Sequence, residues 1–132
     1  MNKIIIALVI LSITFGAGYY FFFRPIPTSQ NDKMKAEELQ ADPLTVVYTN
    51  EGYFPKEIKI KKGETVKYIN MSDRRVWTAS DEHPAHTIYP EFDQKTAAGR
   101  GNEYTFKFDR VGTWGYHNHA NAKHIGTVTV TE

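Results

Sequence analysis

The chain contains no cysteine among its 132 residues. It therefore has no disulfide, no thiolate for binding a metal, no cysteine nucleophile and no cysteine for a lipoprotein anchor. It also lacks an excess of either charge, with 16 lysines and arginines against 15 aspartates and glutamates. Because no basic run breaks that balance, nucleic acid is not expected as a partner.

Common catalytic motifs are absent as well. The sequence has no glycine-rich phosphate loop and no Gly-x-Ser-x-Gly turn. Ser72 and Ser80 are near histidine and aspartate along the chain, but both lie where an irregular loop is expected, which is poor support for a Ser-His-Asp site. We therefore expect a protein that is not an enzyme.

One long uncharged run lies near the N-terminus. Residues 4–23 are 20 residues without a charge, the length of one membrane helix. We favour an uncleaved anchor over residues 1–24, because the aromatics at 19–23 extend the run and suit a membrane interface. A cleaved signal peptide, with small residues at 16–18 as the cleavage region, is the alternative. With Lys3 on the cytoplasmic side, the expected location is the cell membrane, as a single-pass protein with its domain on the extracytoplasmic side.

Residues 25–43 have the composition of a linker. The segment opens with two prolines followed by polar, turn-forming residues. It lacks an apolar stripe that would pack it onto a neighbour. We interpret it as a spacer between the membrane segment and a domain over residues 44–132.

From residue 44 the pattern changes to short strands separated by turns. Residues 57–61 alternate between apolar and charged side chains, as a half-buried strand does. No amphipathic helix is expected in this part of the sequence. The pattern predicts an all-β domain, an antiparallel sandwich or barrel with its aromatic residues in the core. The other strands are expected at 44–49, 65–70, 76–79, 102–108, 113–116 and 127–131.

All five histidines fall in two separate clusters. Imidazole is the commonest protein ligand for divalent transition metals, so two clusters brought together by the fold would make a metal site. The candidate ligands are His83, His86, His117, His119 and His124, the last three in one loop before the final strand.

The first cluster lies in a long loop expected over residues 80–101. His83 and His86 are three residues apart across a proline, which stiffens the loop and lowers the entropy lost when both imidazoles are ordered. Asp81 and Glu82 beside them are candidates for binding the metal themselves or for accepting a hydrogen bond from an imidazole N–H, although exposed charges are the more common role for such residues.

The second cluster contains the least certain member of the site. His117 has the opposite parity along the strand to Trp114 and Tyr116, which are expected in the core, so its side chain should point away from the interior. The hypothesis is therefore that four other histidines form the centre of the site, namely His83, His86, His119 and His124.

Two stretches carry a resemblance to a known family. Residues 52–70 hold a strand, a Lys-Gly turn and a second strand that ends at asparagine. Residues 112–117 and 126–130 frame the C-terminal histidine loop. In this order and spacing they resemble the cupredoxins, the plastocyanin-like copper proteins, and the resemblance covers residues 44–132. It implies an all-β, antiparallel Greek-key β-sandwich with a copper site at one end.

The chain departs from that family at the copper ligands. A blue copper site needs one early histidine, then cysteine, histidine and usually methionine in the last loop. In an ungapped alignment the cysteine position falls on Asn118, the second histidine on Asn121 and the methionine on His124, while the early histidine falls near Trp77. A longer-loop alignment instead puts the cysteine position on Tyr116 and the histidine on His119, and it also restores no thiolate. The resemblance thus implies the fold without blue-copper electron transfer.

Together these features predict a membrane-anchored, extracytoplasmic cupredoxin-like protein that uses a cysteine-free, histidine-rich site to hold, buffer or deliver copper. Copper(II) is favoured because imidazole sites suit it and the frame is that of a copper family, and zinc is possible. The expected partners are the membrane and a copper donor or acceptor, or a redox protein. Two alternatives stay open: an electron-transfer protein or copper-oxidase subunit, and a sandwich domain that binds no metal.

Overall fold

The computed structural model describes Gln30, Met34, Lys35, Glu38 and residues 42–132. The chain divides into two units, Met1–Gln30 and Asn31–Glu132, and every strand belongs to the second. The expected membrane segment and most of the expected linker lie outside the described residues, so both stay predictions. Among the residues described, no helix has the length and apolar character needed to cross a membrane.

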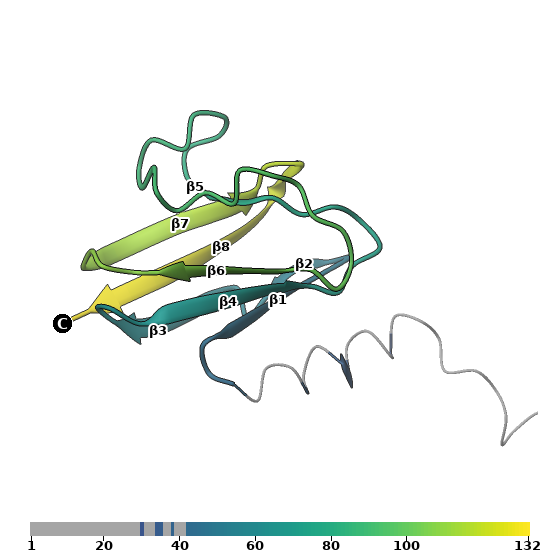
Figure 1. Ribbon diagram of the computed structural model, residues 1–132, viewed down its shortest axis with the longest axis horizontal. Helices are drawn as coiled ribbons and strands as arrows, with labels where there is room; N and C mark the ends of the chain where they lie inside the picture. The colour runs from purple at the N-terminus through teal and green to yellow at the C-terminus, as the bar shows by residue number, and fades with distance from the viewer. Residues whose placement is uncertain (1–29, 31–33, 36–37, 39–41) are drawn as a thin grey trace, which may run out of the picture. The chain divides into compact units, whose positions relative to one another are not determined.

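Within residues 42–132, eight strands form two four-stranded sheets (Figure 1). One sheet has the order β2-β1-β4-β6 and the other has the order β3-β8-β7-β5. This all-β, two-sheet arrangement agrees with the sequence prediction. The strands are β1 (Thr45–Thr49), β2 (Gly52–Phe54), β3 (Glu57–Lys61), β4 (Thr65–Asn70), β5 (Thr78–Ser80), β6 (Glu103–Lys107), β7 (Gly112–Asn118) and β8 (Asn121–Thr131).

Each sheet contains one parallel pair, so the predicted antiparallel arrangement holds for the other strand pairs and is corrected at these two. β1 runs parallel to β4, with Val46 opposite Tyr68, and β3 runs parallel to β8, with Ile58 opposite Val128. The chain leaves the first sheet after β2, forms β3 in the second, and returns as β4 beside β1. Parallel neighbours require such a crossover connection.

The core between the sheets is built from alternating inward residues. β3 shows the pattern most simply, with Ile58 and Ile60 buried and its charged neighbours exposed. Aromatic rings fill much of the interior, and Tyr53 and Tyr116 meet edge to face with centroids 4.9 Å apart. Burying a large apolar side chain contributes about 1.5–3 kcal/mol, so this cluster holds the sheets together. Its fully buried members include Tyr48, Val66, Phe92, Phe108, Tyr116 and Val128.

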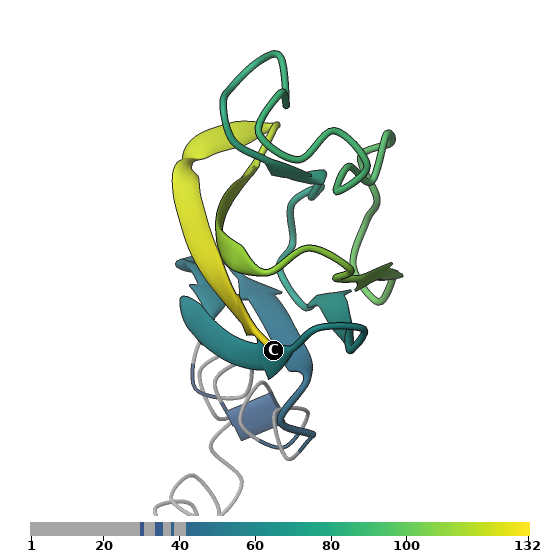
Figure 2. The same cartoon turned by 90° about the vertical axis from the view of Figure 1, so that its left-hand side faces the viewer.

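The edge of the second sheet carries the histidine segments. β5 pairs with β7, with Ala79 opposite His117. The chain then makes a loop over residues 81–91, and Asp93 returns alongside β5 opposite Ala79. In both views this loop rises above β5 at the top of the domain (Figures 1 and 2).

The last hairpin is tighter than the sequence suggested. β7 and β8 are joined by a turn at His119 and Ala120, and Asn118 pairs with Asn121 across it. β8 therefore begins six residues before the strand expected at 127–131 and includes His124. The expectation that His124 lies in a loop is wrong, because two-residue turns suffice to connect antiparallel strands.

Candidate metal centre

Three imidazoles meet at the edge of the second sheet. Each of His83, His117 and His119 offers a ring nitrogen, and the three nitrogens lie within 4.8 Å of one another. Nitrogens bound to one metal at about 2.0–2.1 Å lie roughly 3–3.5 Å apart, so small side-chain rotations would complete such a site. The residues come from two segments that are distant in the sequence and are brought together by the pairing of β5 with β7.

His117 has one nitrogen fixed and one left over. The side chain is 1% exposed, and its Nδ1 lies 3.1 Å from Oδ1 of Asp81. A carboxylate only accepts hydrogen bonds, so the proton sits on Nδ1 and Nε2 carries the lone pair. That buried Nε2 has no hydrogen-bond partner within residues 42–132. A buried polar atom without a partner costs about 1–3 kcal/mol, and a bound metal ion would remove this penalty.

A glycine allows Asp81 to reach His117. A Cβ on Gly115 would lie 2.1 Å from Oδ2 of Asp81, so only glycine leaves room for the carboxylate there. The backbone N–H of Asp81 also donates to the carbonyl oxygen of Gly115, at 2.9 Å. Asp81 is therefore held by two contacts, one from its backbone N–H to Gly115 and one from its carboxylate to His117.

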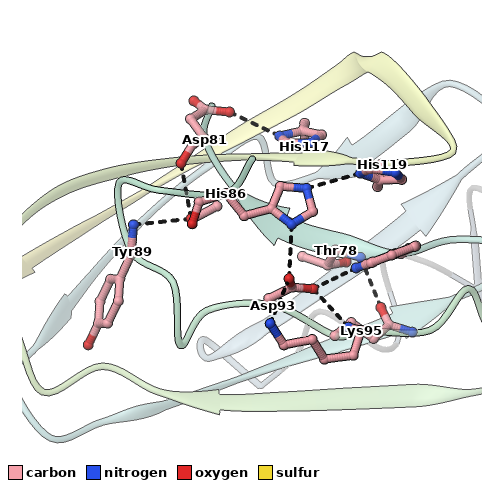
Figure 3. A network of polar contacts seen from close by, with 11 residues as sticks. Thr78, Asp81, His86, Tyr89, Asp93, Lys95, His117 and His119 are labelled. Carbon is pink, nitrogen blue, oxygen red and sulfur yellow. Dashed lines mark hydrogen bonds and ion pairs between the residues drawn. The ribbon is translucent and has the colours of Figure 1, made fainter. Parts of the chain in front are cut away.

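His86 is not one of the three grouped histidines, but it contacts one of them, His119. Its side chain is buried, its Nδ1 is 2.9 Å from Oδ2 of Asp93, and its Nε2 is 3.0 Å from Nδ1 of His119 (Figure 3). His86 has a φ of 54°, a left-handed conformation that is uncommon outside glycine. Such backbone strain persists where the surrounding structure fixes the residue, and it is frequent at functional sites.

Trp77 supports both ends of this chain of contacts. Its Nε1 donates to Oδ1 of Asp93 at 2.6 Å, and its ring lies against His119 with centroids 4.3 Å apart. Burial alone would raise the pKa of Asp93. The hydrogen bonds from Trp77, His86 and Lys95 outweigh that effect and hold the pKa well below its usual range. Asp93 is therefore an anion that accepts hydrogen bonds.

The surroundings favour neutral imidazoles, the form that binds metals. Burial lowers the pKa of His117, and the nearby His86 and His83 lower it further, against the opposing effect of Asp81. Loss of water contact also lowers the pKa of His119, again helped by His86 and His83. Near neutral pH His117 and His119 are therefore neutral and can bind a cation without first losing a proton.

His124 lies apart from this group. Its Nδ1 is 2.8 Å from the hydroxyl of Tyr48, and the two rings lie 5.6 Å apart. The amide of Asn118 donates to the same hydroxyl, at 2.8 Å. Asn118 and His124 are the residues that the resemblance aligns with the cysteine and methionine ligands. Here both contact the hydroxyl of Tyr48. Among the three residues of this network, His124 is the one histidine.

The structure places two of the candidate ligands differently from the expectation. His117, the least certain member from sequence, belongs to the group of three, whereas His124 lies elsewhere. The side chain of His117 was expected to face away from the interior, and in the structure the residue is buried, with 1% exposed. Asp81 contacts a histidine as considered, while Glu82 is exposed.

Sequence reasoning missed two supporting residues, Trp77 and Asp93. Trp77 was identified only as the place where the family's early histidine would fall. Asp93 follows the loop over residues 81–91. The sequence signal for it is a carboxylate seven residues after His86, and that spacing alone does not indicate a contact.

The fold is that of the cupredoxins. The domain resembles the structure of a purple cupredoxin from Nitrosopumilus maritimus, with a TM-score of 0.58 and 20% identity over 66% of this chain and 98% of that chain. It also resembles an oxidized mutant of amicyanin, with a TM-score of 0.60 and 23% identity over 73% of this chain and 89% of that one.

A copper-containing nitrite reductase from Thermus scotoductus SA-01 is similar over 68% of this chain but only 22% of its own, with a TM-score of 0.58 and 23% identity. No protein-family model matches the sequence, and no curated protein matches it. At these identities the likeness extends to the fold, and the chemistry of the site has to be argued from this chain's own residues.

Proposed function

Starting from the cupredoxin fold, we propose that this domain binds a copper ion through His83, His117 and His119 and serves to hold, buffer or deliver it. The observation that carries the proposal is the buried, unpartnered Nε2 of His117, which lies in a group of three imidazoles whose nitrogens are within 4.8 Å of one another. Nothing else in residues 42–132 satisfies that nitrogen, and a metal ion would do so.

Copper is preferred to zinc for two reasons. Imidazole sites bind copper(II) more tightly than the other divalent first-row metals, and structures with this fold include copper proteins by their names. Zinc also accepts three histidines, and it is the competitor that metal analysis must separate. Since the chain has no thiolate, bound copper(II) should absorb visible light only weakly and show a wide hyperfine splitting.

A holding or delivery role is supported by the unequal exposure of the three ligands. His117 is buried and His119 is half-buried, whereas His83 is exposed on the loop over residues 81–91. A metal ion bound there would be anchored from inside and open to solvent on one side. This suits exchange with a donor or acceptor better than permanent enclosure.

The proposal is tested by metal analysis of the full-length chain, purified without an affinity tag. We expect one copper per chain, with the affinity of His117→Ala and His119→Ala lowered by more than ~100-fold, since each change removes a direct ligand rather than an outer partner. His124→Ala is the matched control and should bind as the unchanged protein does.

Two results would contradict the proposal. One is an unchanged chain that binds neither copper nor zinc above background. The other is a His124→Ala variant that loses copper while His117→Ala keeps it, which would move the site to the position of the family's usual ligands.

A further inference from the structure

We propose that Asp93 and His86 act together as a hydrogen-bond relay that fixes the tautomer of His119, leaving Nε2 of His119 as its metal-binding nitrogen. The inference rests on the proposed metal site and assigns His86 a positioning role in place of the ligand role expected from sequence. The relay is a continuous chain of contacts, from Asp93 Oδ2 to His86 Nδ1 and from His86 Nε2 to His119 Nδ1, at 2.9 and 3.0 Å (Figure 3).

The direction of the relay is set at Asp93. Its Oδ1 accepts from Nε1 of Trp77 at 2.6 Å and from the backbone N–H of Lys95 at 2.8 Å. Its Oδ2 faces Nδ1 of His86 and accepts from Nζ of Lys95 at 3.0 Å. A carboxylate held by these donors has no proton to give, so Nδ1 of His86 must donate to it.

The consequences follow from one ring to the next. A neutral imidazole protonated at Nδ1 has its lone pair on Nε2, and Nε2 of His86 points at His119. Nδ1 of His119 must then donate, which places the lone pair of His119 on Nε2. A metal-binding histidine commonly donates its other N–H to a fixed acceptor, and here that acceptor is a second histidine oriented by a carboxylate.

The relay is rigid because the parts around it are fixed. His86 is buried and held in its left-handed backbone conformation. Trp77 lies against the ring of His119 and also donates to Asp93, so one side chain contacts both ends of the relay. If His86 were instead a ligand through Nε2, its contact with His119 would have to break.

Asp93→Asn tests the relay because it reverses the direction of the hydrogen bonds. Two fixed donors, Nε1 of Trp77 and the N–H of Lys95, require the asparagine oxygen at the Oδ1 position. The amide nitrogen then takes the Oδ2 position and donates to Nδ1 of His86. His86 must become protonated at Nε2 and donate to His119, whose own proton moves to Nε2 and blocks the metal.

The experiment measures copper affinity and ring protonation in the full-length chain. In Asp93→Asn we expect affinity to fall by about 10–100-fold, the usual effect of losing an outer partner of a ligand. In metal-free protein at about pH 8, where imidazoles are neutral, nitrogen NMR should find His86 and His119 protonated at Nδ1 in the unchanged chain and at Nε2 in the variant. Lys59→Met is the control, since it removes an exposed lysine of β3, and it should keep both properties.

The outcomes separate the relay from the metal site. Wild-type His119 protonated at Nε2 would overturn the relay, as would an Asp93→Asn variant that binds copper normally. Failure of the unchanged chain to bind copper would overturn the proposed function, while the NMR result would still decide the direction of the relay. If Asp93→Asn does not fold, the tautomers of the unchanged chain decide it alone.

Discussion

Gly115 and Asp81 show how a single residue without a side chain shapes this site. The carboxylate of Asp81 occupies the space where a Cβ on Gly115 would be, and from there it contacts Nδ1 of His117. Glycine is required here for close approach and not for an unusual backbone angle. The orientation of His117 therefore depends on the absence of a Cβ at Gly115, two residues earlier in β7.

Gly115→Ala should weaken copper binding by about 10–100-fold while leaving the domain folded, because the displaced Asp81 side chain is partly exposed and can turn toward water. Copper titration and chemical denaturation measure the two effects. Gly99→Ala is the control, since a Cβ there meets nothing within 4 Å. Normal copper affinity in Gly115→Ala would show that Asp81 does not orient His117.

At the scale of the elements, the β7–β8 hairpin is tightly packed at Gly126. Tyr116 lies opposite Gly126, and a Cβ on Gly126 would lie 2.3 Å from the hydroxyl of Tyr116. Tyr116 is fully buried in the aromatic core, so its ring has no room to move aside. The hairpin depends on glycine at this position for its stability, since only glycine lets the ring cross β8.

Gly126→Ala should lower the free energy of unfolding by about 1–3 kcal/mol, the usual effect of inserting a methyl group into a packed interior. Urea denaturation of the metal-free protein measures it, with Gly99→Ala again as the control. Since the three atoms nearest to the added methyl group all belong to Tyr116, the folded variant should keep its copper affinity. Equal stability of the two variants would mean that the core adapts to the methyl group without strain.

Most of the strands could be predicted from the sequence because each carries its own pattern, but β2 was not expected. The alternation over 57–61 and 65–70 predicts both strands with their bounds as observed. The direction of neighbouring strands could not be predicted, because it depends on where the chain crosses between sheets and no local pattern records that. The early start of β8 was missed because Lys123 and His124 interrupt any apolar alternation.

The candidate site could be predicted only in part. The two histidine clusters were found because imidazoles are rare in this chain and concentrated. His124 was expected to be a central ligand because the family's loop aligns it with a ligand position, whereas the group of three in the structure contains His117 and not His124. Asp93 and Trp77 were missed because the residues that contact each other here are not separated by a spacing that any strand or metal motif predicts.

At the scale of the whole molecule, the stability of the metal-free protein should depend on pH. The pKa values of His117, His119 and His124 are all lowered, in each case chiefly by loss of water contact. Between those lowered values and the ordinary histidine value of about 6.5, the unfolded chain binds more protons than the folded one. Stability is therefore complete above about pH 6.5 and is lost as the pH falls below it.

Urea denaturation at a series of pH values measures this dependence, and we expect the midpoint to fall steadily on the acid side of about pH 6.5. His117→Ala should reduce the slope because it removes one of the three groups. Copper should shift the loss of stability to lower pH, since metal competes with protons for the same nitrogens. A midpoint that rises on acidification would contradict the pKa directions.

The graded exposure of the three imidazoles has a consequence for the kinetics of metal exchange. His83 is exposed, His119 is half-buried and His117 is fully buried, so an incoming ligand can approach a bound ion only from the His83 side. Replacement would then proceed in a fixed order, with the bond to His83 broken first and the bond to His117 last. The rate of metal release would accordingly depend on the concentration and size of the acceptor, and a bulky chelator would act more slowly than a small one of equal affinity.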